Sequence, residues 1–219
     1  VYVCGVLVRD FKDKLSSKDY IFCEDILIEH ASLPIKNDYR YSIGDGIEAS
    51  IGSLPYIFAN TRDKPRIKKL LLFLLFDDFP IGMGGDRLKD FAATIIFHFF
   101  WKENFDDAHS LFLGFLLLKP KYEELIDEVR KENFKKNVYV HTKKQVFKLL
   151  EKRYKKDIDG VLSNTIKYSD ISNIEATELD IVNTAFGLLA PETQHKDHQE
   201  FLKIALPLFA KKLKDEERN

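Results

Sequence analysis

Apolar residues recur at steps of three and four positions along most of this chain, and that spacing is the period of an α-helix. It predicts one helix over 17–32, ended by Pro34, and a second helix after the glycine-containing turn at 44–46. Pro55 lies inside the second helix, which we expect it to bend. The apolar face of that helix consists of Ile47, Ile51, Leu54 and Phe58.

Capping residues and prolines mark the helix that follows. Asp63 with Pro65 close behind predicts its start, because Asp is a preferred N-cap and Pro suits the first helical turn. Residues 70–76 are all apolar, so this helix must be covered on several sides. A loop over 77–85 and a helix over 86–101 are expected next.

Pro120 divides the next apolar stretch. One helix begins near Asp106 and is expected to end at Pro120, which also suits the first turn of the helix after it. Thr142 and Gln145 have the spacing of a capping box, which predicts the start of another helix. Two final helices are predicted from their capping and apolar residues, Thr177, Phe201, Ile204 and Leu208.

The predicted architecture is all-α. Only 2–8 and 137–140 have the composition of strands, and both are too short and isolated to build a sheet. About nine or ten helices of about 12 to 18 residues, arranged as successive pairs, fit either a helical-repeat solenoid or a compact bundle. We favour a HEAT-like solenoid as a single domain over 1–219. Every helix has an apolar face, and Leu54-Pro55 and Leu206-Pro207 stand within helices, where repeats of the HEAT type commonly bend.

Composition narrows the class of protein. Lys and Arg number 34 against 35 Asp and Glu, so the net charge of -1 excludes a generally basic or acidic protein. A chain that is 45% hydrophobic and 32% charged is typical of a folded globular protein. The chain begins at Val1 and its only methionine is Met83, so we interpret it as an excised or processed piece of a longer protein.

Cysteine use and hydropathy indicate the setting. Cys4 and Cys23 are the only cysteines, they lie among apolar neighbours and they form no CxxC motif, which favours a reducing, cytoplasmic location. No apolar stretch reaches the roughly 18 to 20 residues that a bilayer requires. We therefore expect no membrane partner.

No local motif predicts catalysis or a cofactor. The glycine cluster at 80–86 lacks the Gly-Lys-Ser/Thr of a P-loop and the GxGxxG spacing of a dinucleotide site, so we interpret it as a loop capped by Asp86. The sequence also lacks GxSxG and any activated-cysteine signature. We expect neither a cofactor nor enzymatic activity in this chain.

Acidic and histidine residues form two candidate metal sites, and each has a simpler explanation. His195 and His198 stand three residues apart but lack a third histidine, and His98 in its apolar run is interpreted as a core residue. The acidic candidates near His109 stand at helix starts and ends, where capping explains them. They are Asp77, Asp78, Asp86, Asp106 and Asp107.

Positive charge is unevenly distributed. Between Lys119 and Lys156 there are 13 Lys or Arg against six Asp or Glu, an excess of +7. Such a strip is a candidate for contacts with nucleic-acid phosphates, although its aromatic residues have core spacing and lysine-rich helix faces are commonly only solvated. The candidate binding residues are Lys135, Lys136, Lys143, Lys144, Lys148 and Lys152.

Three stretches, 41–55, 112–122 and 179–186, resemble segments of the helical-repeat region of large bacterial STAND-type ATP-binding proteins, several of which act in antiphage (antiviral) defence. The resemblance implies HEAT-like repeats that hold a protein in one conformation or bind a trigger. The ATP-binding module of that family, with its Walker sequences, is absent from this sequence. No functional residue is carried over.

These observations favour a non-enzymatic module of helical repeats that acts as a sensor or scaffold. Its partner is expected to be another protein or other domains of a parent chain. The alternative is a nucleic-acid-binding helical-repeat domain that uses the basic face around 119–156. A third reading is an enzyme whose site is assembled from distant helices, which sequence patterns do not reveal.

Overall fold

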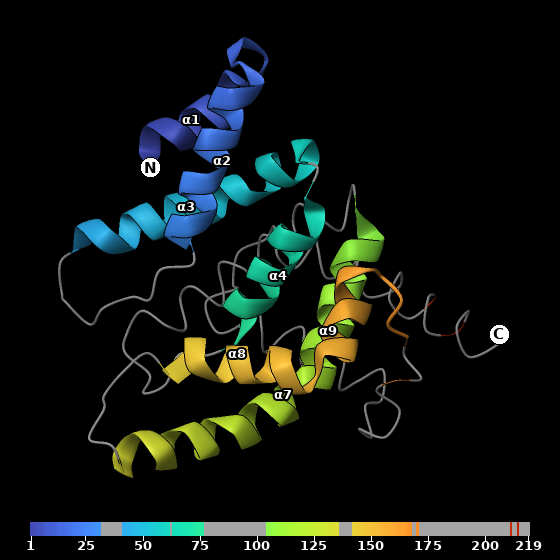
Figure 1. The fold of residues 1–219 in the computed structure, drawn as a ribbon. Helices are drawn as coiled ribbons and strands as arrows, with labels where there is room; N and C mark the ends of the chain where they lie inside the picture. Colours follow the sequence, from blue (N-terminus) through green and yellow to red (C-terminus); the bar gives the residue numbers. More distant parts are fainter. Residues whose placement is uncertain are drawn as a thin grey trace, which may run out of the picture. The chain divides into compact units, whose positions relative to one another are not determined.

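The computed structural model describes residues 1–31, 41–61, 63–76, 104–135, 142–167, 170, 211 and 214, and every regular element within them is a helix (Figure 1). The prediction of an all-α protein is confirmed for these residues. The segments 86–101, 137–140 and 171–210 lie outside the described residues. The elements are α1 (Tyr2–Asp10), the 3-10 helix η1 (Lys12–Lys14), α2 (Ser17–Ala31), α3 (Tyr41–Asn60), α4 (Lys64–Leu75), α7 (Phe105–Lys135), α8 (Thr142–Arg153) and α9 (Lys155–Leu162).

Contacts between helices gather into two compact units, Val1–Ile95 and Ile96–Asn219, and each is described by itself. In the first unit α1 packs against α2 and α3, and α4 also packs against α2 and α3. In the second unit α7 packs against both α8 and α9, which contact each other as well.

Residues 2–8, whose composition is that of a strand, form helix α1 instead. The segment is rich in β-branched residues, whose helix propensity is lower than that of alanine by up to about 0.7 kcal/mol per residue. Packing outweighs this preference, because Val8 is fully buried and Cys4 and Leu7 are half-buried in a helix that contacts α2 and α3.

Helices α1 and α3 approach each other closely at Gly5. A Cβ atom at this position would lie 2.9 Å from Ser53 Oγ, which is closer than a Cβ atom is normally found to any neighbour. The Ser53 hydroxyl is itself held in place, because it donates a hydrogen bond to the carbonyl oxygen of Ala49 at 2.8 Å. Two small residues thus let the two helices meet.

Helix α3 contains residues that were expected to precede or bend it. It begins at Tyr41, so the glycines of 44–46 lie inside the helix rather than before it, and Pro55 lies within its last two turns. Burial of one face offsets the cost of the proline, about 3 kcal/mol. The predicted apolar face is confirmed where side chains are described, because three of its residues are fully buried: Ile51, Leu54 and Phe58.

Helix α4 begins as predicted. The Asp63 side chain accepts a hydrogen bond from the backbone N–H of Arg66 at 3.2 Å, and Pro65 stands in the first turn. All of the apolar residues 70–76 except Phe73 are buried, which confirms that this helix is covered on several sides. The bounds of α2 likewise confirm the helix predicted before Pro34.

Helix α7 passes through Pro120 as one element of 31 residues, so the prediction of two helices that meet at Pro120 is wrong. Lys119 and Pro120 are exposed, whereas Leu118 and Tyr122 are buried. The apolar stripe therefore keeps its contacts on both sides of the proline, which lies on the solvent side of the helix. Figure 1 shows α7 bent along its length.

Helices α7 and α9 cross at two small residues that lie one turn apart on α7. A Cβ atom on Gly114 would lie 2.2 Å from Val161 Cγ2, so only glycine fits there. One turn earlier, the buried Ser110 hydroxyl donates a hydrogen bond to the Val161 carbonyl oxygen at 2.7 Å. That carbonyl lies in the last turn of α9, where backbone acceptors lack helical partners. The crossing therefore satisfies a helix end while it brings two backbones together.

Candidate functional site

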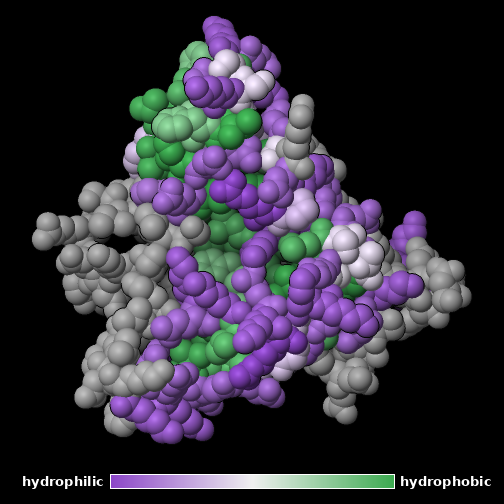
Figure 2. Space-filling view, viewed as in Figure 1, coloured by the Kyte–Doolittle hydropathy of each residue, from purple (hydrophilic) through white to green (hydrophobic). Residues whose placement is uncertain are grey.

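A group of exposed apolar side chains lies on α1, α2 and the residue after α1. Val3 is 69% exposed and Phe22 is 63% exposed. Apolar atoms gather at the top of the view in Figure 2, over these helices. Extended apolar surface with polar surroundings is typical of protein interaction sites. The α1–α2 apolar face, as we name it, consists of Tyr2, Val3, Val6, Phe11, Ile21 and Phe22.

Two ion pairs lie beside the α1–α2 apolar face. Arg9 binds both carboxylate oxygens of Asp10 at 2.8 Å. This hydrogen bonding raises the pKa of Arg9 and lowers the pKa of Asp10. Asp25, one turn after Phe22, binds the guanidinium of Arg66 at 2.6 Å. A partner at this face would therefore meet apolar side chains and, among the flanking charges, two pairs that are already satisfied.

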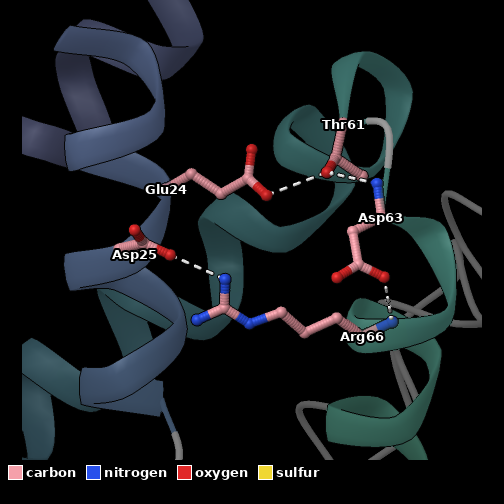
Figure 3. A network of polar contacts seen from close by, with 5 residues as sticks. All are labelled: Glu24, Asp25, Thr61, Asp63 and Arg66. Carbon is pink, nitrogen blue, oxygen red and sulfur yellow. Dashed lines mark hydrogen bonds and ion pairs between the residues drawn. The ribbon is translucent and has the colours of Figure 1, made fainter. Parts of the chain in front are cut away.

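A polar network fixes α2 against the turn between α3 and α4 (Figure 3). Thr61 Oγ1 donates to Glu24 Oε1 at 2.8 Å and accepts from the backbone N–H of Asp63 at 3.1 Å. Glu24 is only 8% exposed, so this hydrogen bond satisfies a carboxylate that is largely removed from water. Arg66 reaches the neighbouring Asp25 on α2. The network thereby holds in place a helix that carries part of the apolar face.

Three of the predicted basic residues form a regular row on α8. Lys144, Lys148 and Lys152 are exposed and follow one another at intervals of four residues, so they lie along one face of the helix, about 6 Å apart. Within the described residues no ion pair involves any of them. We name these three residues the α8 lysine stripe.

The other predicted basic residues do not extend this stripe. Lys135 is exposed at the end of α7, and Lys136 lies outside the described residues. Lys143 is only 7% exposed, because it occupies the same side of α8 as the buried Val146 and Leu150. Lys143 is therefore not part of an exposed basic surface.

Two other cations of the basic region form ion pairs with acidic residues of the chain. Lys121 Nζ lies 2.6 Å from Asp157 Oδ2. Arg153 donates to both carboxylate oxygens of Glu128 at 2.6 Å, and this hydrogen bonding lowers the pKa of Glu128. Both pairs link α7 to α8 or α9. Part of the local excess of positive charge therefore fastens these helices together rather than facing a ligand.

The aromatic residues between these cations belong mainly to the core. Tyr122 is 3% exposed and Phe147 is 5% exposed, so neither offers a face on which a base can stack. Tyr154 is half-buried, and the Lys121 ammonium lies 4.8 Å from the centre of its ring. Of the aromatic side chains that the structure describes here, Tyr122 and Phe147 are thus unavailable for stacking, and Tyr154 is already in contact with Lys121.

An open pocket of about 820 Å³ lies beside α9 in the second unit. Four of its six charged lining residues form two pairs, Lys121 with Asp157 and Lys155 with Asp159. The other two, Lys156 and Asp170, carry opposite charges. A group that is already paired offers little to a charged ligand, because binding would first break the internal contact. The pocket therefore does not define a ligand by its charge.

Asp106, His109 and Ser110 line a smaller pocket of about 330 Å³ in the same unit. The combination of acid, histidine and serine invites comparison with a catalytic triad. A serine hydroxyl has one proton, however, and that of Ser110 is donated to the carbonyl oxygen of Val161. The serine is therefore not activated by the histidine as a nucleophile would be.

Within the described residues, no group of three or more His, Cys, Asp or Glu side chains is arranged to hold a metal ion. Asp107, one of the acidic candidates, accepts a hydrogen bond from Asn164 Nδ2 at 2.8 Å. The remaining candidates lie outside the described residues: Asp77, Asp78, the 80–86 loop with Asp86, His98, His195 and His198.

Among the residues that the structure describes, none of the helices combines the length and apolar character that a membrane span requires.

Sequence reasoning missed the α1–α2 apolar face. The signal was present in adjacent apolar pairs, Tyr2-Val3 on α1 and Ile21-Phe22 on α2. In a helix that buries one stripe, two consecutive apolar residues cannot both lie in the core. The apolar residues left over, the surplus, must face solvent or a partner. Because 2–8 was considered only for its strand-like composition, its helical pattern and the surplus of apolar residues in it were not recognised.

These features define an all-α protein with an exposed apolar face in one unit and a lysine stripe in the other. No model of a known protein family matches the chain, and no curated protein matches it. The geometry of these two surfaces is therefore the basis on which a function is proposed.

Proposed function

We propose that this protein is a non-enzymatic binding module that uses the α1–α2 apolar face to bind another protein. The observation that carries the proposal is the exposure of six large apolar side chains there, among them Val3 at 69% and Phe22 at 63%. Burying such surface contributes about 25 cal/mol per Å² of apolar area. Aromatic and aliphatic anchors of this kind form the centres of protein interfaces.

The expected partner offers an apolar protein surface without a strong charge of either sign. Arg9 with Asp10, and Asp25 with Arg66, already satisfy each other beside the face, so a highly charged partner would gain little from them. A separate protein and another domain of a longer parent chain both meet this description. Binding is expected to depend only weakly on salt, because apolar burial is not screened.

We also propose that the helices belong to a helical-repeat stack of the HEAT kind in a sensor or scaffold protein, as the resemblance to STAND-type defence proteins implies. Contacts between alternate helices support this, because α1 contacts α3 and α2 contacts α4, as in stacked helix pairs. The 31 residues of α7 exceed the length of an ordinary repeat helix, which keeps a compact bundle as the alternative.

The experiment compares three forms of the protein: wild type, the double variant Val3→Ser with Phe22→Ser, and the control Lys18→Ser. Lys18 lies one turn before Phe22 on α2 and is exposed. Proteins that co-purify with each form are identified, and a candidate partner is then purified and titrated against each form by calorimetry at about 0.1 M and 0.5 M salt.

We expect the double variant to bind the purified partner at least about tenfold more weakly, while the control and the higher salt change the affinity little. Both altered residues of the double variant are mostly exposed, so its folding should be retained and is checked by circular dichroism. Retention of every partner by the double variant would contradict the proposal, as would an affinity that falls steeply with salt.

The second candidate function is binding of a phosphate polymer such as nucleic acid along the α8 lysine stripe. The observation that favours it is the spacing of Lys144, Lys148 and Lys152 along one exposed helix face, without ion pairs within the described residues. The proposal rests on contacts with phosphates and does not require bases to stack on aromatic side chains. The salt dependence of oligonucleotide binding tests it.

A further inference from the structure

Cys4 on α1 and Cys23 on α2 are the only cysteines among the 219 residues, and the structure brings them together. The two helices pack against each other, and Cys4 is a neighbouring side chain that interacts with the Cys23 thiol. Neither residue forms a disulfide in this structure. With no third cysteine in the sequence, an oxidised form of this chain alone has a single intramolecular pairing open to it.

The two thiols differ in access to solvent. Cys23 is 4% exposed, whereas Cys4 is half-buried. A reagent in solution therefore reaches Cys4 first, and Cys23 stands behind it within contact. One accessible thiol with a resolving partner is the arrangement found in oxidation-sensitive dithiols.

We propose that Cys4 and Cys23 form a dithiol that small-molecule disulfides oxidise to an intramolecular disulfide, which fastens α1 to α2. The closed bond places the two sulfur atoms about 2.05 Å apart, so it must fit the native packing of α1 and α2. The proposal concerns the chemistry of this pair and does not depend on what binds to the α1–α2 apolar face.

The reaction consists of two thiol–disulfide exchanges. The Cys4 thiolate attacks a small disulfide RSSR, its S–S bond breaks, and one RS⁻ leaves and takes up a proton. The Cys23 thiolate then attacks the Cys4 sulfur of the mixed disulfide and displaces the second RS⁻. The protein dithiol loses two electrons and two protons, and RSSR becomes two RSH.

The environment of Cys23 makes the second exchange the slow one. Burial, with the interaction with Cys4 as a further cause, raises the pKa of the Cys23 thiol to about 11, so few molecules carry this thiolate at neutral pH. The mixed disulfide on Cys4 is therefore expected to accumulate briefly before the intramolecular bond closes.

The closed bond restrains the unfolded chain over the loop from Cys4 to Cys23. Loops of this length stabilise a folded protein enough to raise its melting temperature by about 5–10 °C. The effect should be reversed completely by a reductant, because nothing else in the chain is oxidised.

The test incubates the intact chain with oxidised glutathione in excess and follows it by intact mass and peptide mapping. The expected product is a monomer that has lost two hydrogen atoms, with the peptides of Cys4 and Cys23 linked and the melting temperature raised by several degrees. Cys4→Ser and Cys4→Ala should both remain unlinked and show no rise. Because Cys4 is half-buried, these variants are expected to fold.

The proposal is overturned if the wild-type chain keeps two free thiols, stops at a stable glutathione adduct on Cys4, or forms only disulfide-linked dimers. It is also overturned if the intramolecular bond forms and the melting temperature falls, because the bond would then not fit the native packing of α1 and α2.

Discussion

At the scale of single residues, the packing of α7 on α9 depends on a position without a side chain. Gly114 lies so close to Val161 that a methyl group cannot be placed between them, and the Ser110 hydrogen bond fixes the same crossing one turn away. Packed interiors tolerate little change of volume at such contacts. The identity of this one residue therefore sets the distance between two helices.

We expect Gly114→Ala to lower the free energy of unfolding by about 2 kcal/mol or more, because its Cβ atom would fall 2.2 Å from Val161 Cγ2. The measurement is urea-induced unfolding followed by circular dichroism. The double change Gly114→Ala with Val161→Ala should recover part of the loss, since it removes the methyl groups that clash.

The matched control is Gly160→Ala, one residue from Val161 in α9. A Cβ atom there meets no atom closer than 3.8 Å. The free energy of unfolding of this variant should therefore equal that of wild type or exceed it by about 0.5–1 kcal/mol. Equal destabilisation by the two alanines would mean that the α7–α9 contact is not as close as described.

Because of two buried groups on α2, the free energy of unfolding is expected to change with pH in the alkaline range. Burial raises the pKa of Cys23 to about 11 and that of Tyr20 to about 12. The folded state thus retains the neutral forms more strongly than the unfolded chain does. Their contribution is complete below the unfolded pKa values and is lost as the pH rises through the folded ones. We expect the free energy of unfolding to fall between about pH 9 and pH 12.

Tyr20→Phe separates the two contributions. The Tyr20 hydroxyl is buried and has no hydrogen-bond partner within the described residues, so its removal should cost little stability at neutral pH. The variant should lose the part of the alkaline decline above about pH 10, which is measured by urea unfolding under reducing conditions. A profile identical to wild type would show that Tyr20 titrates normally in the folded protein.

At the scale of elements, the network in Figure 3 contains one buried and one exposed contact of similar length. Thr61 reaches the buried Glu24 at 2.8 Å, whereas Arg66 reaches Asp25 at 2.6 Å with both side chains about half exposed. A hydrogen bond to a buried carboxylate is more costly to lose than a solvated ion pair.

Thr61→Val should therefore lower the free energy of unfolding by about 1–3 kcal/mol, because it leaves Glu24 without this donor. Arg66→Ala should lower it by less than about 1 kcal/mol, since the Asp63 cap uses the backbone of Arg66 and survives. Chemical denaturation of both variants measures the order. Thr61→Ser retains the hydroxyl and should lie close to wild type. The reverse order would show that the surface pair, not the buried hydrogen bond, holds α2.

Local chemistry made some elements predictable and left others unpredictable. The Asp63 cap with Pro65 marks the start of α4 correctly, because a cap acts within one turn. Pro120 and the strand-like segment 2–8 misled, because each was judged by propensity alone. In both places one buried face supplies more free energy than the local preference costs, and such burial depends on residues distant in sequence.

The candidate surfaces were likewise predictable only where a local pattern was sufficient. The period of α8 correctly places Lys144, Lys148 and Lys152 on one face, since four residues make about one turn. The exclusion of Lys143 from that face requires knowing which side of α8 is buried. The contact of Cys4 with Cys23 likewise depends on how α1 packs against α2, which a periodicity within either helix does not specify.

At the scale of the whole molecule, the balance of 34 basic and 35 acidic residues hides a separation of surface properties. The α1–α2 apolar face belongs to the first unit, and the α8 lysine stripe belongs to the second. Binding by the first is expected to be insensitive to salt, whereas binding of a phosphate polymer by the second must weaken with salt. Salt dependence therefore distinguishes the two proposed functions without knowledge of the natural ligand.

The triple variant Lys144→Glu, Lys148→Glu and Lys152→Glu tests the second surface against fluorescent 20-mers of single-stranded and duplex DNA. If the stripe neutralises about three phosphates, the logarithm of the wild-type affinity should fall with the logarithm of salt concentration with a slope of about -2 to -3. The variant should lose measurable binding. The control reverses Lys12, Lys14 and Lys18 of the first unit, all exposed, and makes the same change in net charge. Equal losses in both variants would reveal only an effect of overall charge, and unchanged affinity in the α8 variant would exclude the stripe as the binding surface.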